Sequence, residues 1–233
     1  MRLAICLIFL LSSMMTMGQD KNNYELSGVC KYTYNAKGER SEELNFDANN
    51  TLIGKNQYVF DEKGNIIKSE KYLADGTLSV TSEYTYDDEN QVVTSVETDH
   101  TSKKTINEQH FYNNLGEKMR TEYRENNQLI REVHYHYSAE GDENVHSDHD
   151  SNGVLTSAFF TSYKYDDLGN VKEKLIRDSE GVMIEINRYK YDDKLKVSTC
   201  FSVYNTEGKK NSKCEYQFDA NGREIGFKLY VAN

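Results

Sequence analysis

A tyrosine–aspartate–glycine signature that returns about every 26 residues is the feature that most constrains this chain. The clearest copies are Tyr58–Asn65, Tyr163–Asn170 and Tyr216–Arg223. Further copies begin at Tyr32, Tyr84, His110, Tyr135 and Tyr189. A motif repeated at fixed spacing indicates a repeat architecture, in which each copy is one small structural unit.

Each copy divides into two halves of about 13 residues, and each half reads as a strand followed by a short turn. Leu129, Val133 and Tyr135 alternate with Ile130 and His134, a period of two that is typical of half-buried strands. Turns such as Asp61–Gly64 supply a capping carboxylate and a glycine. We therefore predict an all-β antiparallel meander of about 14 to 16 strands over residues 20–233, arranged as an extended curved or spiralling sheet. The pattern leaves open whether this sheet closes.

One segment departs from the alternation. By the alternation, Val182, Ile184 and Ile186 fall on one face of the strand, and Met183 and Tyr189 fall on the other, so the aliphatic residues do not share the face of the aromatic residue. Either a bulge shifts the phase there, or both faces of that strand are covered, and the pattern leaves both readings open.

The N-terminus predicts export. Arg2, the apolar run Leu3–Leu11 and the small residues of Thr16–Gly18 are typical of a secretory signal peptide over residues 1–18, leaving residues 19–233 as a single β-repeat domain. The apolar run is too short to span a membrane. We expect an exported protein that is periplasmic, displayed on the outer surface or secreted.

The charge balance argues against a nucleic-acid partner. The chain has 28 Lys+Arg against 38 Asp+Glu and a formal net charge of −10, and its cations are not clustered. Phosphate binding relies on clustered cations. Proline is absent, as expected if nearly every residue pairs within a sheet.

The Tyr-x-Tyr-Asp-x-x-Gly-(Asn/Arg) pattern, carried for example by Tyr163, Tyr165, Asp166, Gly169 and Asn170, resembles the YD repeat of RHS-type bacterial proteins. That resemblance covers about Tyr32 to Arg223 and implies consecutive β-hairpins in one antiparallel sheet that curls into a spiral or shell. The chain has no room for the toxin domain that those large proteins enclose. It also resembles small uncharacterised exported proteins of Bacteroidetes.

The aromatic pairs are the first candidates for a ligand site. Tyr135, Tyr137, Tyr163 and Tyr165 belong to a row that we expect on one face of the sheet. Cross-strand aromatic contacts stabilise sheets on their own, so a structural role suffices to explain the row. The alternative is an open platform that binds sugars or peptide side chains.

A histidine-rich segment offers a second candidate site. All six histidines lie between His100 and His149, and we expect the hairpin after Tyr137 to bring His146 opposite His134, with Asp148 one step further. Two imidazoles and a carboxylate suit zinc or copper. The spacing matches no known metal motif and polar strand faces often carry histidines, so we predict no tightly bound metal and no cofactor.

Cys200 and Cys214 flank the turn at Asn205–Gly208 and are candidates for a disulfide across it. Packing alone is the alternative explanation, because Cys30 and Cys214 occupy the same slot of the first and last copies. The acidic turns resemble no EF-hand loop, and turn capping accounts for their carboxylates.

These patterns predict a protein that is not an enzyme, because no catalytic motif is present. The leading hypothesis is an exported binding or surface-scaffold module for a glycan, a peptide or an envelope protein. One alternative is a shell or inhibitor component related to bacterial toxin systems. The other is a metal-dependent enzyme built around His134, His146 and Asp148.

Overall fold

A computed structural model describes residues 23–139, 141–192, 194, 196–205 and 211–232. The predicted signal peptide, residues 1–18, lies outside these residues. The described residues form antiparallel strands and hold no helix that would serve as a membrane span. The strands are β1 (Tyr24–Tyr34), β2 (Arg40–Asp47), β3 (Leu52–Phe60), β4 (Ile66–Leu73), β5 (Leu78–Tyr86), β6 (Val92–Asp99), β7 (Lys104–Tyr112), β8 (Lys118–Glu125), β9 (Gln128–Tyr137), β10 (Glu143–Asp150), β11 (Leu155–Tyr165), β12 (Val171–Asp178), β13 (Met183–Tyr191), β14 (Val197–Tyr204), β15 (Ser212–Phe218) and β16 (Glu224–Ala232).

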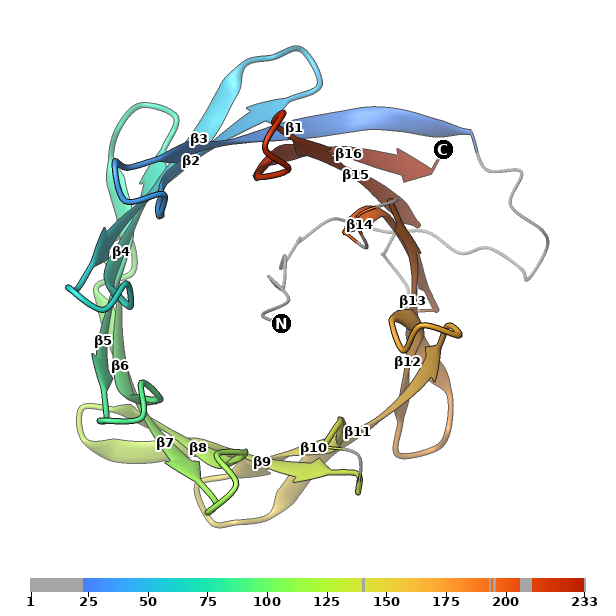
Figure 1. The fold of residues 1–233 in the computed structure, drawn as a ribbon. Coiled ribbons are helices and arrows are strands. Elements are labelled where there is room, and N and C mark those ends of the chain that lie inside the picture. The colour runs from blue at the N-terminus through green and yellow to red at the C-terminus, as the bar shows by residue number, and fades with distance from the viewer. Residues whose placement is uncertain (1–22, 140, 193, 195, 206–210, 233) are drawn as a thin grey trace.

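The sheet closes into a barrel. Each strand pairs with its neighbours in the chain, and β1 also pairs with β16, as Figure 1 shows at the top of the ring. The predicted antiparallel meander is confirmed, with sixteen strands. The predicted extended or spiralling sheet is wrong, because the hairpins curve steadily enough for the last strand to meet the first. Closure removes both free edges that an open sheet would expose.

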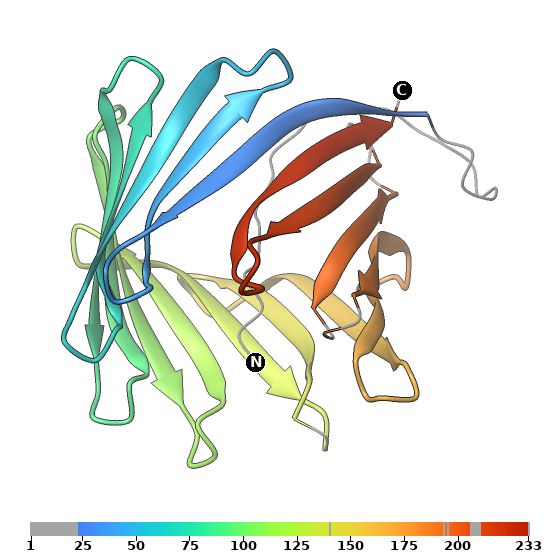
Figure 2. The same cartoon turned by 45° about the horizontal axis from the view of Figure 1, so that its top comes forward.

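Short turns of one type join each odd-numbered strand to the next strand. In the turn after β3, the Asp61 carboxylate accepts the Asn65 amide hydrogen at 2.8 Å, and Gly64 adopts φ +84°. A register shift falls between Val59 and Phe60, just before the turn. Figure 2 shows that the turns after odd-numbered strands lie at one end of the barrel and the described turns after even-numbered strands at the other.

The repeated aromatic residues lie on one face of the wall, as the alternation predicts, and this face is the inner one. Burial is the largest cause that raises the pKa values of Tyr58, Tyr135 and Tyr189 on this face. On the opposite face, the largest cause that shifts the pKa values of Lys68 and Glu70 is the side-chain hydrogen bond between them, not burial. Side chains converge on the concave side of a closed wall and spread apart on its convex side, so the desolvated tyrosines line the interior.

Tyrosine hydroxyls connect neighbouring hairpins at one rim. In five repeats a hydroxyl donates to the carbonyl of a residue 19 or 20 positions earlier, at the start of the preceding strand: Tyr86 to Ile66, Tyr112 to Val92, Tyr137 to Lys118, Tyr163 to Glu143, and Tyr191 to Val171. Tyr34 makes the corresponding bond to the Glu224 carbonyl, across the junction of β1 and β16. The junction that closes the ring is therefore built like those inside it.

Side chains do not fill the barrel. Sixteen strands about 4.8 Å apart and tilted by about 40° enclose a ring roughly 30 Å across, whereas side chains fill a barrel of only about eight strands. Most inward tyrosines of the described residues are accordingly only half-buried. The one cluster of buried apolar side chains among these residues, Cys30, Cys214, Phe227 and Leu229, lies beside the junction of β1 and β16.

The strand that departed from the alternation is covered on both faces. β13 begins at Met183 and pairs without interruption from Glu185 to Lys190 on its β14 side. Ile186 points outward and is buried between its cross-strand partners Leu175 and Val203. On its β12 side, however, the pairing passes from Ile176–Glu185 to Arg177–Met183, so a bulge at Ile184 shifts the phase there. The bulge explains the departure from alternation, and Ile186 is covered on the outer face as well.

Candidate functional site

The four predicted ligand-binding tyrosines lie on the inner face, and part of their bonding capacity is used by the wall. Tyr137 and Tyr163 each donate to a carbonyl of the adjacent hairpin, at 3.0 and 3.2 Å. The Tyr165 hydroxyl donates to the Asp142 carboxylate, and its ring lies 6.4 Å from that of Tyr163. Tyr135 lies beneath the Lys118 ammonium group, 4.6 Å from the ring centre. The hydroxyls of Tyr137, Tyr163 and Tyr165 thus fix their rings against the wall, and Tyr165 keeps 45% of its surface exposed to a ligand.

Beside Tyr135, β7, β8 and β9 bring together a group of polar and charged side chains on the inner face that we call the inner polar cluster: Glu108, His110, Lys118, Thr121 and Arg131. Burial raises the pKa of Glu108, lowers the pKa of Lys118, and lowers the pKa of His110 to about 4. Clustered pKa shifts of this kind are typical of functional sites. The inner polar cluster is therefore the strongest candidate site in the described part of the barrel.

A hydroxyl, an imidazole and a carboxyl group lie in series within this cluster. Thr121 Oγ1 is 3.0 Å from His110 Nδ1, His110 Nε2 is 3.6 Å from Glu108 Oε2, and that oxygen accepts the Ser95 hydroxyl at 3.0 Å. The order resembles a nucleophile and its base. Thr121, however, has no exposed surface, so a substrate cannot reach its hydroxyl. The series is a satisfied polar network that stiffens the wall.

The two cations of the cluster lie over aromatic rings. The Arg131 guanidinium is 4.1 Å from the centre of the Tyr123 ring and 3.4 Å from the Asp148 carboxylate. Cation–π contacts stabilise such groups in place by about 0.5–2 kcal/mol each. Arg131 therefore presents fixed hydrogen-bond donors toward the interior, next to the ring of Tyr135.

The sequence patterns missed the inner polar cluster, although one signal was visible. His110 occupies the slot where most other repeats carry the first tyrosine of the aromatic pair. Glu108 and Thr121 gave no signal, because isolated polar residues on a strand usually face water.

His134 and His146, the expected metal ligands, point to opposite faces. His146 pairs with Tyr135, and His134 pairs with Ser147, one residue away from the expected register. His146 therefore lies inside, where its ring packs 4.9 Å from that of Phe159. Asp148 pairs with Val133 on the inner face and contacts Arg131. Within the described residues no three histidine, cysteine or carboxylate side chains meet as metal ligands.

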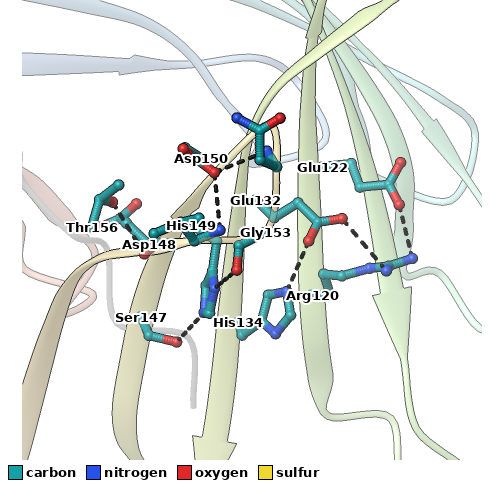
Figure 3. Close-up of polar contacts among 12 residues, drawn as sticks. Arg120, Glu122, Glu132, His134, Ser147, Asp148, His149, Asp150, Gly153 and Thr156 are labelled. Carbon is teal, nitrogen blue, oxygen red and sulfur yellow. Dashed lines mark hydrogen bonds and ion pairs between the residues drawn. The ribbon is translucent and has the colours of Figure 1, made fainter.

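On the outer face, His134 joins a charged network that Figure 3 shows in close-up. Glu122 and Glu132 are direct cross-strand neighbours, and Arg120 lies between them, 2.8 and 3.6 Å from their carboxylates. His134 Nε2 is 3.1 Å from Glu132, and its ring stacks on that of His149 at 4.4 Å. The network neutralises two neighbouring carboxylates, so it accounts for these residues structurally.

Cys200 and Cys214 are directly opposite each other in the pairing of β14 with β15. The described structure joins them by no disulfide bond, and burial raises the pKa of the Cys200 thiol to about 11. A thiol with so high a pKa is protonated and unreactive at neutral pH. The predicted disulfide stays a prediction.

Comparison with known proteins supports the fold. No protein-family model matches the chain, and no curated protein does either. Among solved structures, a porin-like protein from Bacteroides uniformis matches with a TM-score of 0.51 and 11% identity, over 96% of this chain and 94% of that one. This likeness shows a shared fold.

Two structures of a much larger protein match more weakly. The TcdB2-TccC3-Cdc42 structure gives a TM-score of 0.39 at 17% identity over 89% of this chain. TcdB2-TccC3 without its hypervariable C-terminal region gives 0.38 at 17% identity over 92%. This chain spans 12% of the length of each.

Proposed function

We propose that this chain is a non-enzymatic exported scaffold that binds an elongated ligand, a glycan or a polypeptide, inside its barrel. The observation that supports this most directly is that the repeated aromatic residues face inward in a closed ring. A ligand of the tyrosine row must therefore enter the barrel. Tyrosine suits such a surface, because its ring offers apolar contact while its hydroxyl stays hydrogen-bonded.

The inner polar cluster supports the same proposal. It places the donors of Arg131 and Lys118 beside the rings of Tyr123 and Tyr135. Ligand sites usually combine apolar surface with a few fixed polar groups that set orientation. The buried hydroxyl of Thr121 argues for binding rather than covalent chemistry at this place.

The outer face supports contact with water rather than lipid. Ion pairs such as Lys164–Glu173 and Arg188–Glu173 lie on it, and the network around Arg120 adds further charges. Barrels embedded in a bilayer instead present an apolar band about 25 Å tall, where charged side chains cost roughly 2–4 kcal/mol each. We therefore infer a scaffold that works outside the bilayer.

Matched single variants test the proposal. Tyr165→Ala removes an exposed inner ring, and Tyr72→Ala removes a ring from the outer face. The purified wild-type protein is screened against arrays of envelope glycans and peptides, and each hit is measured with both variants after circular dichroism confirms folding. We expect the inner variant to bind at least ten-fold more weakly and the outer variant to bind normally. Equal effects of the two variants would refute binding inside the barrel.

A shell or inhibitor role related to bacterial toxin systems is the second candidate, and closure of the ring favours it. A wall that surrounds its contents is suited to shielding a polypeptide segment. The screen separates the two roles, since a shell requires a polypeptide ligand that becomes resistant to protease when bound. A glycan ligand would argue against this second role.

A further inference from the structure

Side chains at one rim reach from each turn to the next. In several turns after odd-numbered strands, the fifth residue lies over the glycine of the following turn. A Cβ added at Gly64 would lie 3.2 Å from Glu39 Oε1, and one at Gly116 would lie 2.8 Å from Gln91 Nε2. Gln91 also donates to the Gly116 carbonyl at 3.1 Å. At these two contacts the reaching group is a carboxylate or an amide.

The contact between the last two turns of this rim carries positive charge instead. A Cβ added at Gly222 would lie 3.1 Å from Lys196 Nζ and 3.7 Å from Lys194 Nζ, so the two ammonium groups converge on one point. Arg223 follows Gly222 directly, and its guanidinium packs 4.3 Å from the centre of the Tyr34 ring. Two ammonium groups therefore meet over Gly222, whereas the Arg223 guanidinium is directed to Tyr34 of β1 and pairs with Asp219.

The nearby carboxylates leave the two ammonium groups uncompensated. The Asp192 carboxylate accepts hydrogen bonds from the backbone N–H groups of Lys194 and Lys196, both at 2.9 Å. The Asp219 carboxylate accepts one from Arg223 Nε at 3.2 Å. Neither ammonium group has a carboxylate oxygen within 4.0 Å among the residues that the structure describes. Burial raises the pKa of Glu224, a further acid that acts on Lys196, and so disfavours its charged form. Two like charges this close repel each other unless an anion lies between them.

We propose that Lys194 and Lys196 form a binding site for an oxyanion, a phosphate or sulfate group, at the mouth of the barrel. The chain as a whole is acidic, with a net charge of −10, so general attraction does not bring anions to it. Charge-assisted hydrogen bonds from two ammonium groups suit the oxygens of such a group. Lys196 Nζ lies 5.3 Å from the centre of the inward ring of Phe218, which places the site on the inner edge of the rim. An oxyanion there would be free in solution or would belong to a glycan that enters the barrel.

The test is a calorimetric and NMR titration of the whole mature protein with inorganic sulfate and phosphate at constant ionic strength. Lys196→Asn removes one ammonium group and installs a residue that already occupies this turn position at Asn65 and Asn170. Lys63→Gln makes the same change of charge in the turn after β3 and serves as the control. We expect sulfate and phosphate to shift the amide signals of Lys196 and Gly222, with at least ten-fold weaker binding in Lys196→Asn and no change in Lys63→Gln.

Three results would overturn the proposal: no saturable binding to the wild type, equal binding to Lys196→Asn, or equal weakening by Lys63→Gln. A sulfated disaccharide and its unsulfated parent identify the source of the anion. Tighter binding of the sulfated sugar than of inorganic sulfate assigns the site to a glycan, and equal binding assigns it to the free ion. Because the cations lie at the rim, a protein without this anion site can still bind a ligand at the inner tyrosine row. The two proposals can therefore fail independently.

Discussion

The tyrosine of the repeat serves two purposes at the scale of one residue. Its ring lines the interior, and its hydroxyl satisfies a carbonyl at the end of the neighbouring hairpin, as Tyr112 does for Val92 at 2.9 Å. Phe60 and Phe218 occupy the corresponding slot in two repeats, so the fold tolerates loss of a single hydroxyl. Each bond therefore contributes modestly, and the row contributes as a set.

We predict that Tyr112→Phe lowers the free energy of unfolding by about 1 kcal/mol, the usual net contribution of one hydrogen bond. Tyr84→Phe is the control, because Tyr84 is the first tyrosine of its pair and its hydroxyl does not reach a neighbouring carbonyl in the described structure. Urea unfolding measures both variants. Equal midpoints for Tyr112→Phe and the wild type would show that the carbonyl is satisfied without the tyrosine.

His110 makes stability depend on pH. Burial lowers its pKa to about 4 in the folded protein, against about 6.5 in the unfolded chain. Between these values the unfolded chain binds more protons, so stability is complete above pH 6.5 and falls as pH drops toward 4. The raised pKa of Glu108 opposes this trend in part.

We predict that the free energy of unfolding is roughly 1–3 kcal/mol lower at pH 4.5 than at pH 7, and that His110→Gln reduces this difference. Urea titrations of both proteins at the two pH values measure it. An unchanged pH dependence in the variant would assign the effect to the carboxylates of the turns.

At the scale of the hairpin, the sequence was sufficient for the strands and insufficient for the register. Alternation located the strands, and the aspartate and glycine of each turn located their ends. A register shift between Glu143 and Val145 nevertheless moves β10 by one residue, so His146 faces Tyr135 rather than His134. Such a shift exchanges the two faces, and the sequence carries no local signal for it.

The rim contacts give a prediction for the turns. Gly116 and Gly76 both adopt positive φ, +79° and +85°, so alanine costs about 1 kcal/mol at either position. Only at Gly116 would the new Cβ also displace a neighbour, Gln91, whereas Gly76 has open space. We predict that Gly116→Ala lowers the thermal midpoint more than Gly76→Ala. The same shift for both variants would show that the turn-to-turn contact adds no stability.

Closure is a property of the whole molecule that no single repeat encodes. The repeat predicts curvature, but whether the last strand meets the first depends on the number of hairpins and the angle that each one adds. The buried cluster of Cys30, Cys214, Phe227 and Leu229 lies beside the closing junction. The sequence placed Cys30 and Cys214 in the same slot of the first and last copies, but nothing in it brings those two copies together. The inner polar cluster escaped prediction for the same reason, because it needs a defined interior.

Gly226 permits the closing contact. Its φ is +148°, and an added Cβ would lie 2.0 Å from the backbone oxygen of Cys30 across the junction. We predict that Gly226→Ala separates β16 from β1 and destabilises the protein by more than 3 kcal/mol, on the order of a severe core defect. Gly181→Ala, at φ +81° with open space around it, serves as the control and should cost about 1 kcal/mol. Equal thermal midpoints for the two variants would contradict this role.

The central claim, a closed ring with tyrosines inside, is tested most directly by nuclear Overhauser contacts between β1 and β16 in the isotope-labelled protein. We predict contacts that join Val29 to Lys228 and Cys30 to Phe227, as strong as those that join Val29 to Phe46 within the first hairpin. The amides of both strands should also exchange slowly with solvent. Contacts within the first hairpin without any between β1 and β16, together with fast exchange along one edge of each strand, would show an open sheet and contradict the account.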